Sequence, residues 1–276
     1  MYYRTSPMSL GGRGSGCSGR LIMAAAIAIF SLISYFGATQ KNPITGETQH
    51  ISITPEQEIA LGLQAAPEME SQFGGEDPNP NDQAIVDQVG NKVLQGSSAA
   101  NAPYQFDFHL LADPQTINAF ALPGGQVFIT RALYDKLQTE GELAGVLGHE
   151  MGHVVARHSA EQIAKAQLTE GLTGAAVIAA YDPNNPSSVN SAQVAALIGQ
   201  LVTLKFTRDD ETEADKFGVC FMNEAGYDPN EMVSVMQILQ ASETGNQPPE
   251  FFSTHPSPAN RIQQIQSDIQ NINACP

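Results

Sequence analysis

Residues Thr139–Ser159 read TEGELAGVLGHEMGHVVARHS and contain the pattern His-Glu-x-x-His. A Thr-x-x-Glu capping box opens this stretch and predicts one helix through about Ser159. His149 and His153 are four residues apart and therefore share one face of that helix. Both imidazoles can bind a single Zn²⁺, and Glu150 then lies beside the open coordination position, where it can take a proton from bound water. The pattern predicts a zinc site suited to metal-assisted hydrolysis.

A catalytic zinc of this kind needs a third protein ligand. Signatures with a third His six residues after the second are excluded, because a serine occupies that position. His158, one residue earlier, points elsewhere on a continuous helix and is interpreted as a packing or surface residue. In the acidic helix start TRDDETEAD, residues 207–215, Glu211 can ligate zinc while Asp215, one turn later, accepts a hydrogen bond from a ligand imidazole. Spacing alone does not choose between Glu211 and Glu213.

Four stretches in a fixed order carry a resemblance to a known family. They are NAFALPGG at 118–125, HEMGHVVARHS at 149–159, RDDETEAD at 208–215, and STHP at 253–256 with Arg-Ile at 261–262. Together they span about residues 104–265 and resemble the HtpX-type zinc peptidases (gluzincins), which include the CAAX prenyl proteases and periplasmic members such as BepA and LoiP. The chain is most similar to the soluble or singly anchored branch. The resemblance implies that Glu211 is the third metal ligand.

The resemblance also implies roles for residues outside the two helices. The segment over residues 118–121 is expected to be an edge strand above the zinc. An extended substrate would add to this strand through main-chain hydrogen bonds. His255 is expected at the active site, where it either reaches the zinc and holds the enzyme inactive or stabilises the developing oxyanion. Arg261 is expected to pair with an acid near the site. The expected substrate-binding residues are Asn118, Ala119, Phe120 and Ala121.

The charged residues are unevenly distributed along the chain. With 13 Lys and Arg against 29 Asp and Glu, the net charge is −16, which argues against a nucleic-acid partner. Residues 1–20 form a short basic tail without any acid, and residues 21–38, LIMAAAIAIFSLISYFGA, are at the lower limit for a membrane-spanning helix. We expect a signal anchor in the inner membrane, with the N-terminus inside and the catalytic domain in the periplasm. A cleaved signal peptide and a mitochondrial presequence are the alternatives.

The rest of the chain is predicted to be a polar stalk over 39–53 and one domain over 54–276. Its expected fold class is α+β, a mainly helical zincin-like domain with a small, mostly antiparallel sheet. Cys220 and Cys275 can form a disulfide in an oxidising compartment or remain two separate buried thiols, and the sequence leaves both possibilities open.

The expected function is that of a zinc-dependent endopeptidase with one Zn²⁺ per chain, acting on protein or peptide substrates. Only the family resemblance suggests that these are misfolded or misassembled envelope proteins. The alternative is a zinc-bound chaperone or assembly factor that binds extended segments at the edge strand and cleaves rarely. A purely structural zinc is disfavoured, because such sites usually have four Cys or His ligands and no Cys lies near either motif.

Overall fold

The computed structural model describes residues 15–180, 205–242, 249–256 and 260–275. Residues 1–14 of the expected basic tail therefore lie outside the described residues. The larger helices are α1 Ser15–Gly37, α2 Pro55–Gln72, α3 Pro80–Gly96, α5 Glu140–Val155, α6 His158–Ala180, α8 Arg208–Glu224, α9 Asn230–Ala241 and α11 Arg261–Gln270. The short helices are η1 Ser98–Asn101, α4 Arg131–Tyr134, α10 Phe251–Thr254 and η2 Ile272–Ala274. The strands are β1 Thr39–Lys41, β2 Thr48–His50, β3 Asp107–Leu111, β4 Ala119–Ala121 and β5 Gln126–Thr130.

The expected α+β class, mainly helical with small sheets, is confirmed. The three-stranded sheet has the order β3-β5-β4 and is mixed, whereas a mostly antiparallel sheet was expected. β4 and β5 are antiparallel, with Phe120 opposite Phe128, but β3 and β5 are parallel, with Leu110 opposite Ile129. The parallel pair arises because the chain reverses between β3 and β4 and again between β4 and β5. β5 therefore runs in the direction of β3.

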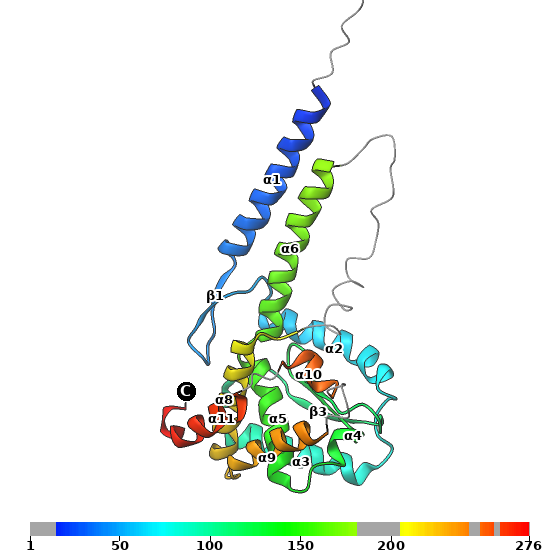
Figure 1. Ribbon diagram of the computed structural model, residues 1–276, viewed down its shortest axis with the longest axis vertical. Coiled ribbons are helices and arrows are strands. Elements are labelled where there is room, and N and C mark those ends of the chain that lie inside the picture. The colour runs from blue at the N-terminus through cyan, green and yellow to red at the C-terminus, as the bar shows by residue number, and fades with distance from the viewer. Residues whose placement is uncertain (1–14, 181–204, 243–248, 257–259, 276) are drawn as a thin grey trace, which may run out of the picture.

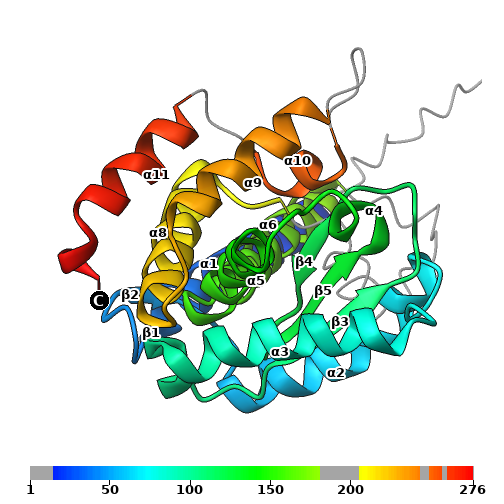
Figure 2. The same cartoon turned by 90° about the horizontal axis from the view of Figure 1, so that it is seen from below.

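Helix α5 is the central element of the globular part. All of its residues from Gly141 to Val155 are buried, which is possible because the helix is apolar on almost every side. It lies between the three-stranded sheet and the pair α8 and α9 (Figure 2). α2 begins at a complete capping box of Thr54 and Gln57, as the sequence predicts, and α2 and α3 pack near the sheet. This arrangement surrounds the His-Glu-x-x-His segment with protein.

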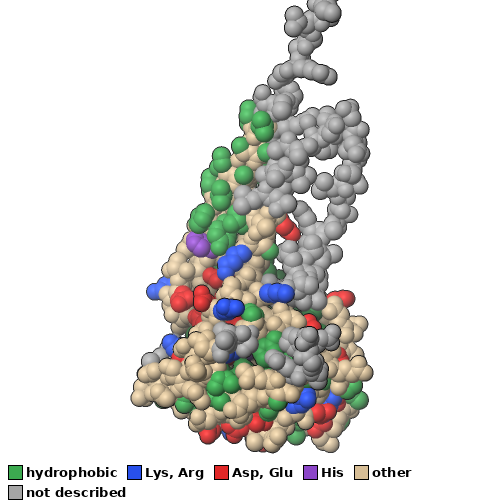
Figure 3. Space-filling model, viewed as in Figure 1, with side chains coloured by type: hydrophobic (Ala, Val, Ile, Leu, Met, Phe, Trp, Pro, Cys, Tyr) green, Lys and Arg blue, Asp and Glu red, His purple; other side chains and the backbone are tan. Residues whose placement is uncertain are grey.

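α1 and α6 lie side by side and project from the globular part (Figure 1). Apolar side chains are exposed along α1 (Figure 3). Of the ten large apolar side chains that are exposed in the described residues, eight belong to this helix. They are Leu21, Ile22, Met23, Ile29, Phe30, Leu32, Ile33 and Phe36. Within the described part of the chain no helix is both long and apolar enough to cross a membrane, which differs from the membrane-spanning segment expected over 21–38.

The hairpin β1–β2, within the segment expected as a stalk, packs against the C-terminal end of α5. Asn42 donates a hydrogen bond to the carbonyl of Val155 at 2.8 Å, and Gln49 donates to that of Ala156 at 2.6 Å. The last carbonyls of a helix lack partners within the helix, so these two side chains satisfy them. The hairpin thereby connects α1 to the end of the central helix.

Cys220 and Cys275 form a disulfide, which decides between the two possibilities that the sequence left open. Cys220 lies on α8 and is buried, and Cys275 follows η2 near the end of the chain. The bond links the segment after α11 to α8 across a sequence separation of 55 residues.

Candidate metal centre

The two histidines of the central helix point at one another across a single turn. The Nε2 atoms of His149 and His153 are 3.1 Å apart, and both side chains are buried. α5 begins where Thr139 accepts a hydrogen bond from the backbone N–H of Glu142. Thr139 is therefore the N-cap that the sequence predicts, but the expected capping box is incomplete, because Glu142 accepts from the backbone N–H of Gln138 and not from that of Thr139. The helix aligns the two imidazoles as their spacing requires.

Helix α8 approaches α5 closely enough for Glu211 to reach both imidazoles. A Cβ atom at Gly152 would lie 2.8 Å from the carbonyl oxygen of Ala214, so a side chain at this position would push the helices apart. At the observed separation, Glu211 Oε1 lies 3.3 Å from His153 Nε2, and Glu211 Oε2 lies 3.7 Å from His149 Nε2. Thr207 caps α8 in a capping box, with Asp210 as the reciprocal partner.

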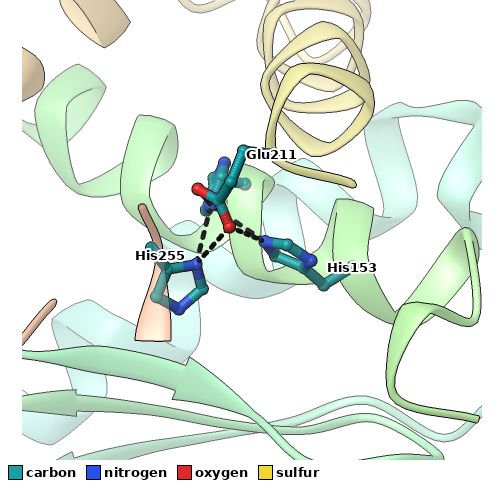
Figure 4. Close-up of side chains that lie close together, drawn as sticks. His153, Glu211 and His255 are labelled. Carbon is teal, nitrogen blue, oxygen red and sulfur yellow. Dashed lines mark hydrogen bonds and ion pairs between the residues drawn. The ribbon is translucent and has the colours of Figure 1, made fainter. Parts of the chain in front are cut away.

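His255, which follows α10, completes a group of four potential ligands. Its Nδ1 atom is 2.9 Å from Glu211 Oε1 and 3.4 Å from His149 Nε2. One ligand atom from each of His149, His153, Glu211 and His255 lies within 4.8 Å of all the others. Figure 4 shows His153, Glu211 and His255 directed toward a common point. All four side chains are buried.

Asp215 and Arg261 form a buried ion pair behind this group. Asp215 Oδ1 lies 2.9 Å from His149 Nδ1, and the guanidinium of Arg261 donates to both carboxylate oxygens at 2.7 and 2.8 Å. Arg261 also reaches Glu211 Oε2 at 2.8 Å. Burial alone would raise the pKa of Asp215, but the charge of Arg261 and the contact with His149 lower it. The structure thus brings both expected supporting residues to the site.

The donor set fits a divalent metal ion. Because His149 Nδ1 contacts the carboxylate of Asp215, its proton lies there and its Nε2 atom carries a lone pair. That lone pair faces His153 Nε2 and Glu211, so acceptor atoms converge where a cation would bind. In addition, both carboxylate oxygens of Glu150 are buried, and no described residue forms a hydrogen bond with them. Two His, one Glu and a nearby carboxylate match the composition of a catalytic rather than a structural metal site.

The pKa shifts at the site follow from burial and from neighbouring charges. Burial raises the pKa of Glu150 and lowers the pKa of His153 well below its usual range. Burial alone would raise the pKa of Glu211, but the charge of His255 and the contacts with His153 and His255 hold it well below normal. Glu211 is thus favoured as a carboxylate and His153 as a neutral imidazole, which are the forms that bind metal.

The expected substrate-binding segment lies at the edge of the sheet. Among the strands of the described residues, β4 pairs with β5 alone, and Asn118 directly precedes it. A pocket of about 310 Å³ opens between this strand, α2 and His255. Its apolar lining residues are Met69, Phe73, Phe120, Ala121, Leu122 and Phe206.

One residue at the site was misjudged from the sequence. His158 does not point away on a continuous helix, because α5 ends at Val155 and α6 begins at His158. Its Nδ1 atom lies 2.9 Å from Nδ1 of His153, and its Nε2 atom lies 3.2 Å from Glu213 Oε2. The break between the helices carries no Gly or Pro, so no local sequence signal indicated it.

The fold and the buried His-His-Glu group define a metallopeptidase, and comparison with known proteins agrees. The model of peptidase family M48 matches residues 80–269, and the chain belongs to this family. This confirms the coarser part of the resemblance seen in the sequence, membership of a metallopeptidase family with BepA-like relatives, but not a particular branch.

Relatives of two kinds are similar to the chain. The β-barrel assembly-enhancing protease of Yersinia pestis is 34% identical over 192 residues, which cover 67% of this chain and 38% of the relative. The corresponding protease of Escherichia coli K12 is 30% identical over 205 residues, with 69% and 40% covered. The mitochondrial metalloendopeptidase OMA1 of Schizosaccharomyces pombe is 30% identical over 251 residues, with 90% and 70% covered. The chain thus aligns with only about two fifths of the bacterial relatives.

Proposed function

We propose that the chain is a zinc-dependent endopeptidase in which His149, His153 and Glu211 hold the metal and Glu150 acts as the general base. The observation that carries this proposal is the convergence of three buried ligand atoms, which all lie within 4.8 Å of one another, beside a buried carboxylate that has no hydrogen-bond partner among the described residues. The raised pKa of Glu150, caused by burial, suits a group that both accepts and returns a proton near neutral pH.

The chain's own residues can carry out the steps of peptide hydrolysis. Zinc, when bound, would polarise the scissile carbonyl and acidify the attacking water. Glu150 removes the proton from that water as it attacks the carbonyl carbon, and later delivers a proton to the nitrogen of the leaving amine. Asp215 keeps the proton of His149 on Nδ1, and Arg261 neutralises the charge of Asp215.

We propose that His255 closes the site in the observed conformation. Its Nδ1 atom contacts Glu211 Oε1, and its Nε2 atom is 3.7 Å from Glu150 Oε1. The ring therefore occupies the space through which substrate and water would have to enter. The charges of Glu211 and Glu150 raise the pKa of His255 against the effect of burial. If the ring moves outward, it can instead face the oxygen of the scissile carbonyl, which is the second role expected for it.

The proposed substrate is an extended segment of an envelope protein that is misfolded or misassembled. The edge of β4 that no described strand covers (with Asn118, Ala119, Phe120 and Ala121) can pair with such a segment, and the adjacent pocket can take an apolar side chain. The name of the bacterial relatives, β-barrel assembly-enhancing protease, supports an envelope substrate.

We also propose that the protein acts outside the cytoplasm, in the periplasm, attached to the inner membrane through α1. A disulfide is typical of an oxidising compartment, and the exposed apolar side chains of α1 are suited to lie in a lipid interface. The similarity to OMA1 supports a mitochondrial location as the second possibility. Flotation of the full-length chain with lipid vesicles tests the membrane contact. Wild type should float with the vesicles, and the proposed contact through α1 is wrong if the double variant Ile29→Ser/Ile33→Ser floats equally well.

The test of the proposed activity is zinc content together with casein hydrolysis by the full-length chain. Wild type should bind one zinc and cleave, whereas Glu150→Gln should keep the zinc and lose at least about a hundredfold in rate. Glu140→Gln, which changes an exposed carboxylate of the same helix, serves as the control and should remain active. His255→Ala should cleave faster if His255 closes the site. Zinc binding without cleavage by any variant would favour a binding or assembly factor, and absence of zinc would overturn the proposal.

A further inference from the structure

The backbone between α5 and α6 adopts a conformation that residues with side chains rarely take. Arg157 has φ of +61°, and among the described residues it is the one non-glycine residue with positive φ. Such a conformation is unfavourable because the Cβ atom approaches the backbone. Strain of this kind persists only where the surroundings hold the residue in place, and it often occurs at functional sites.

Buried polar contacts hold Arg157 in this conformation. Its guanidinium donates to Glu58 at 2.8 Å, to Gln40 Oε1 at 2.9 Å and to the carbonyl of Ile53 at 3.0 Å. Arg157 and Glu58 are both almost completely buried. The bend between α5 and α6 at Arg157 is therefore stabilised by three segments of the chain, namely β1, the residues before α2, and α2 itself.

The consequence of the bend is the position of the next residue. On a continuous helix, a residue five positions after His153 would lie on a different face. With the bend, His158 turns back so that its Nδ1 atom meets Nδ1 of His153 at 2.9 Å. Both rings are buried, with 1% of each residue exposed.

The positions of the protons in this pair follow from the contacts at both ends. His153 Nε2 faces Glu211 and His149 Nε2 in the ligand group, so its lone pair is needed there and its proton lies on Nδ1. His158 Nδ1 must then accept that hydrogen bond, which leaves its own proton on Nε2, facing Glu213 at 3.2 Å. The chain of contacts therefore runs from the metal site through two imidazoles to a carboxylate.

We propose that His158 is a positioning residue for the metal ligand His153, and that Glu213 orients His158 through the contact with its Nε2 atom. The proposal rests on the metal site proposed above and assigns a role to two residues outside it. Three of the acids of α8 then act on different members of the site: Glu211 as a ligand, Asp215 on His149 directly, and Glu213 on His153 through His158. A partner of this kind fixes the tautomer and orientation of a ligand imidazole and strengthens metal binding.

The test measures zinc affinity by competition with a chelator, using the full-length chain, and does not depend on activity. His158→Leu fills the space but accepts no hydrogen bond, and should weaken zinc binding about 10- to 100-fold. His158→Asn keeps an acceptor near the Nδ1 position and should retain most of the affinity. The absorption spectrum of the Co²⁺-substituted protein should change in the Leu variant and resemble wild type in the Asn variant.

Met151→Ala is the matched control for a general loss of stability. Met151 is fully buried on the same helix, belongs to the hydrophobic core and has no polar contact with a ligand, so its zinc affinity should remain that of wild type. If His158→Leu does not fold, Glu213→Ala replaces it, because the Glu213 side chain is 27% exposed. This variant should lose about tenfold in affinity, whereas Asp209→Ala, which removes an exposed acid from the same helix, should not.

The outcomes separate this proposal from the proposed function. If wild type binds no zinc, both proposals fail together. If wild type binds zinc and cleaves, but His158→Leu and Glu213→Ala bind zinc equally well, only the positioning role is wrong. Equal losses in His158→Leu and His158→Asn would overturn it too, because the hydrogen-bond acceptor would not matter.

Discussion

Breaking the Cys220–Cys275 disulfide should lower the stability of the fold without removing a metal ligand. The bond closes a loop with a sequence separation of 55 residues. For a loop of that length, the loss of chain entropy in the unfolded state corresponds to a stabilisation of about 4 kcal/mol. The loop contains α9, α10, α11 and η2, and α8 at its start carries Glu211 and Asp215.

The assay is thermal unfolding followed by circular dichroism, on wild type with and without reductant and on Cys275→Ser. For a domain of 150–250 residues each kcal/mol shifts Tm by about 2–4 °C, so Tm should fall by roughly 8–16 °C. Cys17→Ser is the matched control, because it removes the third cysteine of the sequence and leaves the bond intact. Its Tm should equal that of wild type and should fall equally on reduction.

Two results would refute this reasoning. The first is a reduced wild type that unfolds within about 2 °C of the oxidised protein, which would mean that the loop is constrained equally well without the bond. The second is a reductant that lowers the Tm of Cys275→Ser as much as that of wild type, since the effect would then not come from this disulfide.

Three further predictions concern the surroundings of the site and the sheet. Arg261→Met leaves the buried Asp215 without its cation and should lower the free energy of unfolding by about 3–5 kcal/mol in urea; an unchanged urea midpoint would contradict the pairing. The hydrogen bond from Arg131 lowers the pKa of Asp77 in the folded protein. The ion pair therefore stabilises the fold above the unfolded-state pKa of about 4, and this stabilisation is lost as pH falls through the lower pKa of the folded state. The stability difference between wild type and Asp77→Asn should therefore shrink from pH 7 to pH 3, and a constant difference would argue against the ion pair. Gly124 has φ of +86°, and a Cβ there would lie 2.3 Å from Cα of Ile59, so Gly124→Ala should cost more than about 1 kcal/mol. Gly46→Ala, with φ of +73° and no atom of a described residue within 4 Å of the added Cβ, isolates the backbone strain and should cost less.

The parts of the fold that were predictable depend on contacts within a few residues. Thr54 and Gln57 form the capping box expected at the start of α2, and Thr207 caps α8. His149 and His153 meet because four residues make about one helical turn. In each case the interacting atoms lie on one short segment, so the spacing of residue types is sufficient to predict the geometry.

The features that were not predictable depend on distant segments. The continuous helix expected through Ser159 is interrupted at Arg157, because Gln40 and Glu58 hold that residue in a conformation that its own neighbours do not favour. The sheet is mixed because two reversals of the chain place β5 parallel to β3. Neither result can be inferred from local propensity, since both arise from packing between separate elements.

The same distinction applies to the site. The sequence alone supplied the two histidines, the base Glu150 and a set of acids, because helix periodicity places i and i+4 on one face. Family resemblance, not spacing, favoured Glu211 over Glu213. Only the folded chain shows that Glu211, Asp215 and Glu213 each face a different partner, that His255 joins the group across 106 residues, and that Cys220 pairs with Cys275. The physical reason is that these contacts form when separate elements pack together, as α8 does against α5 at Gly152, and such packing depends on the shape of the whole core and not on any one segment.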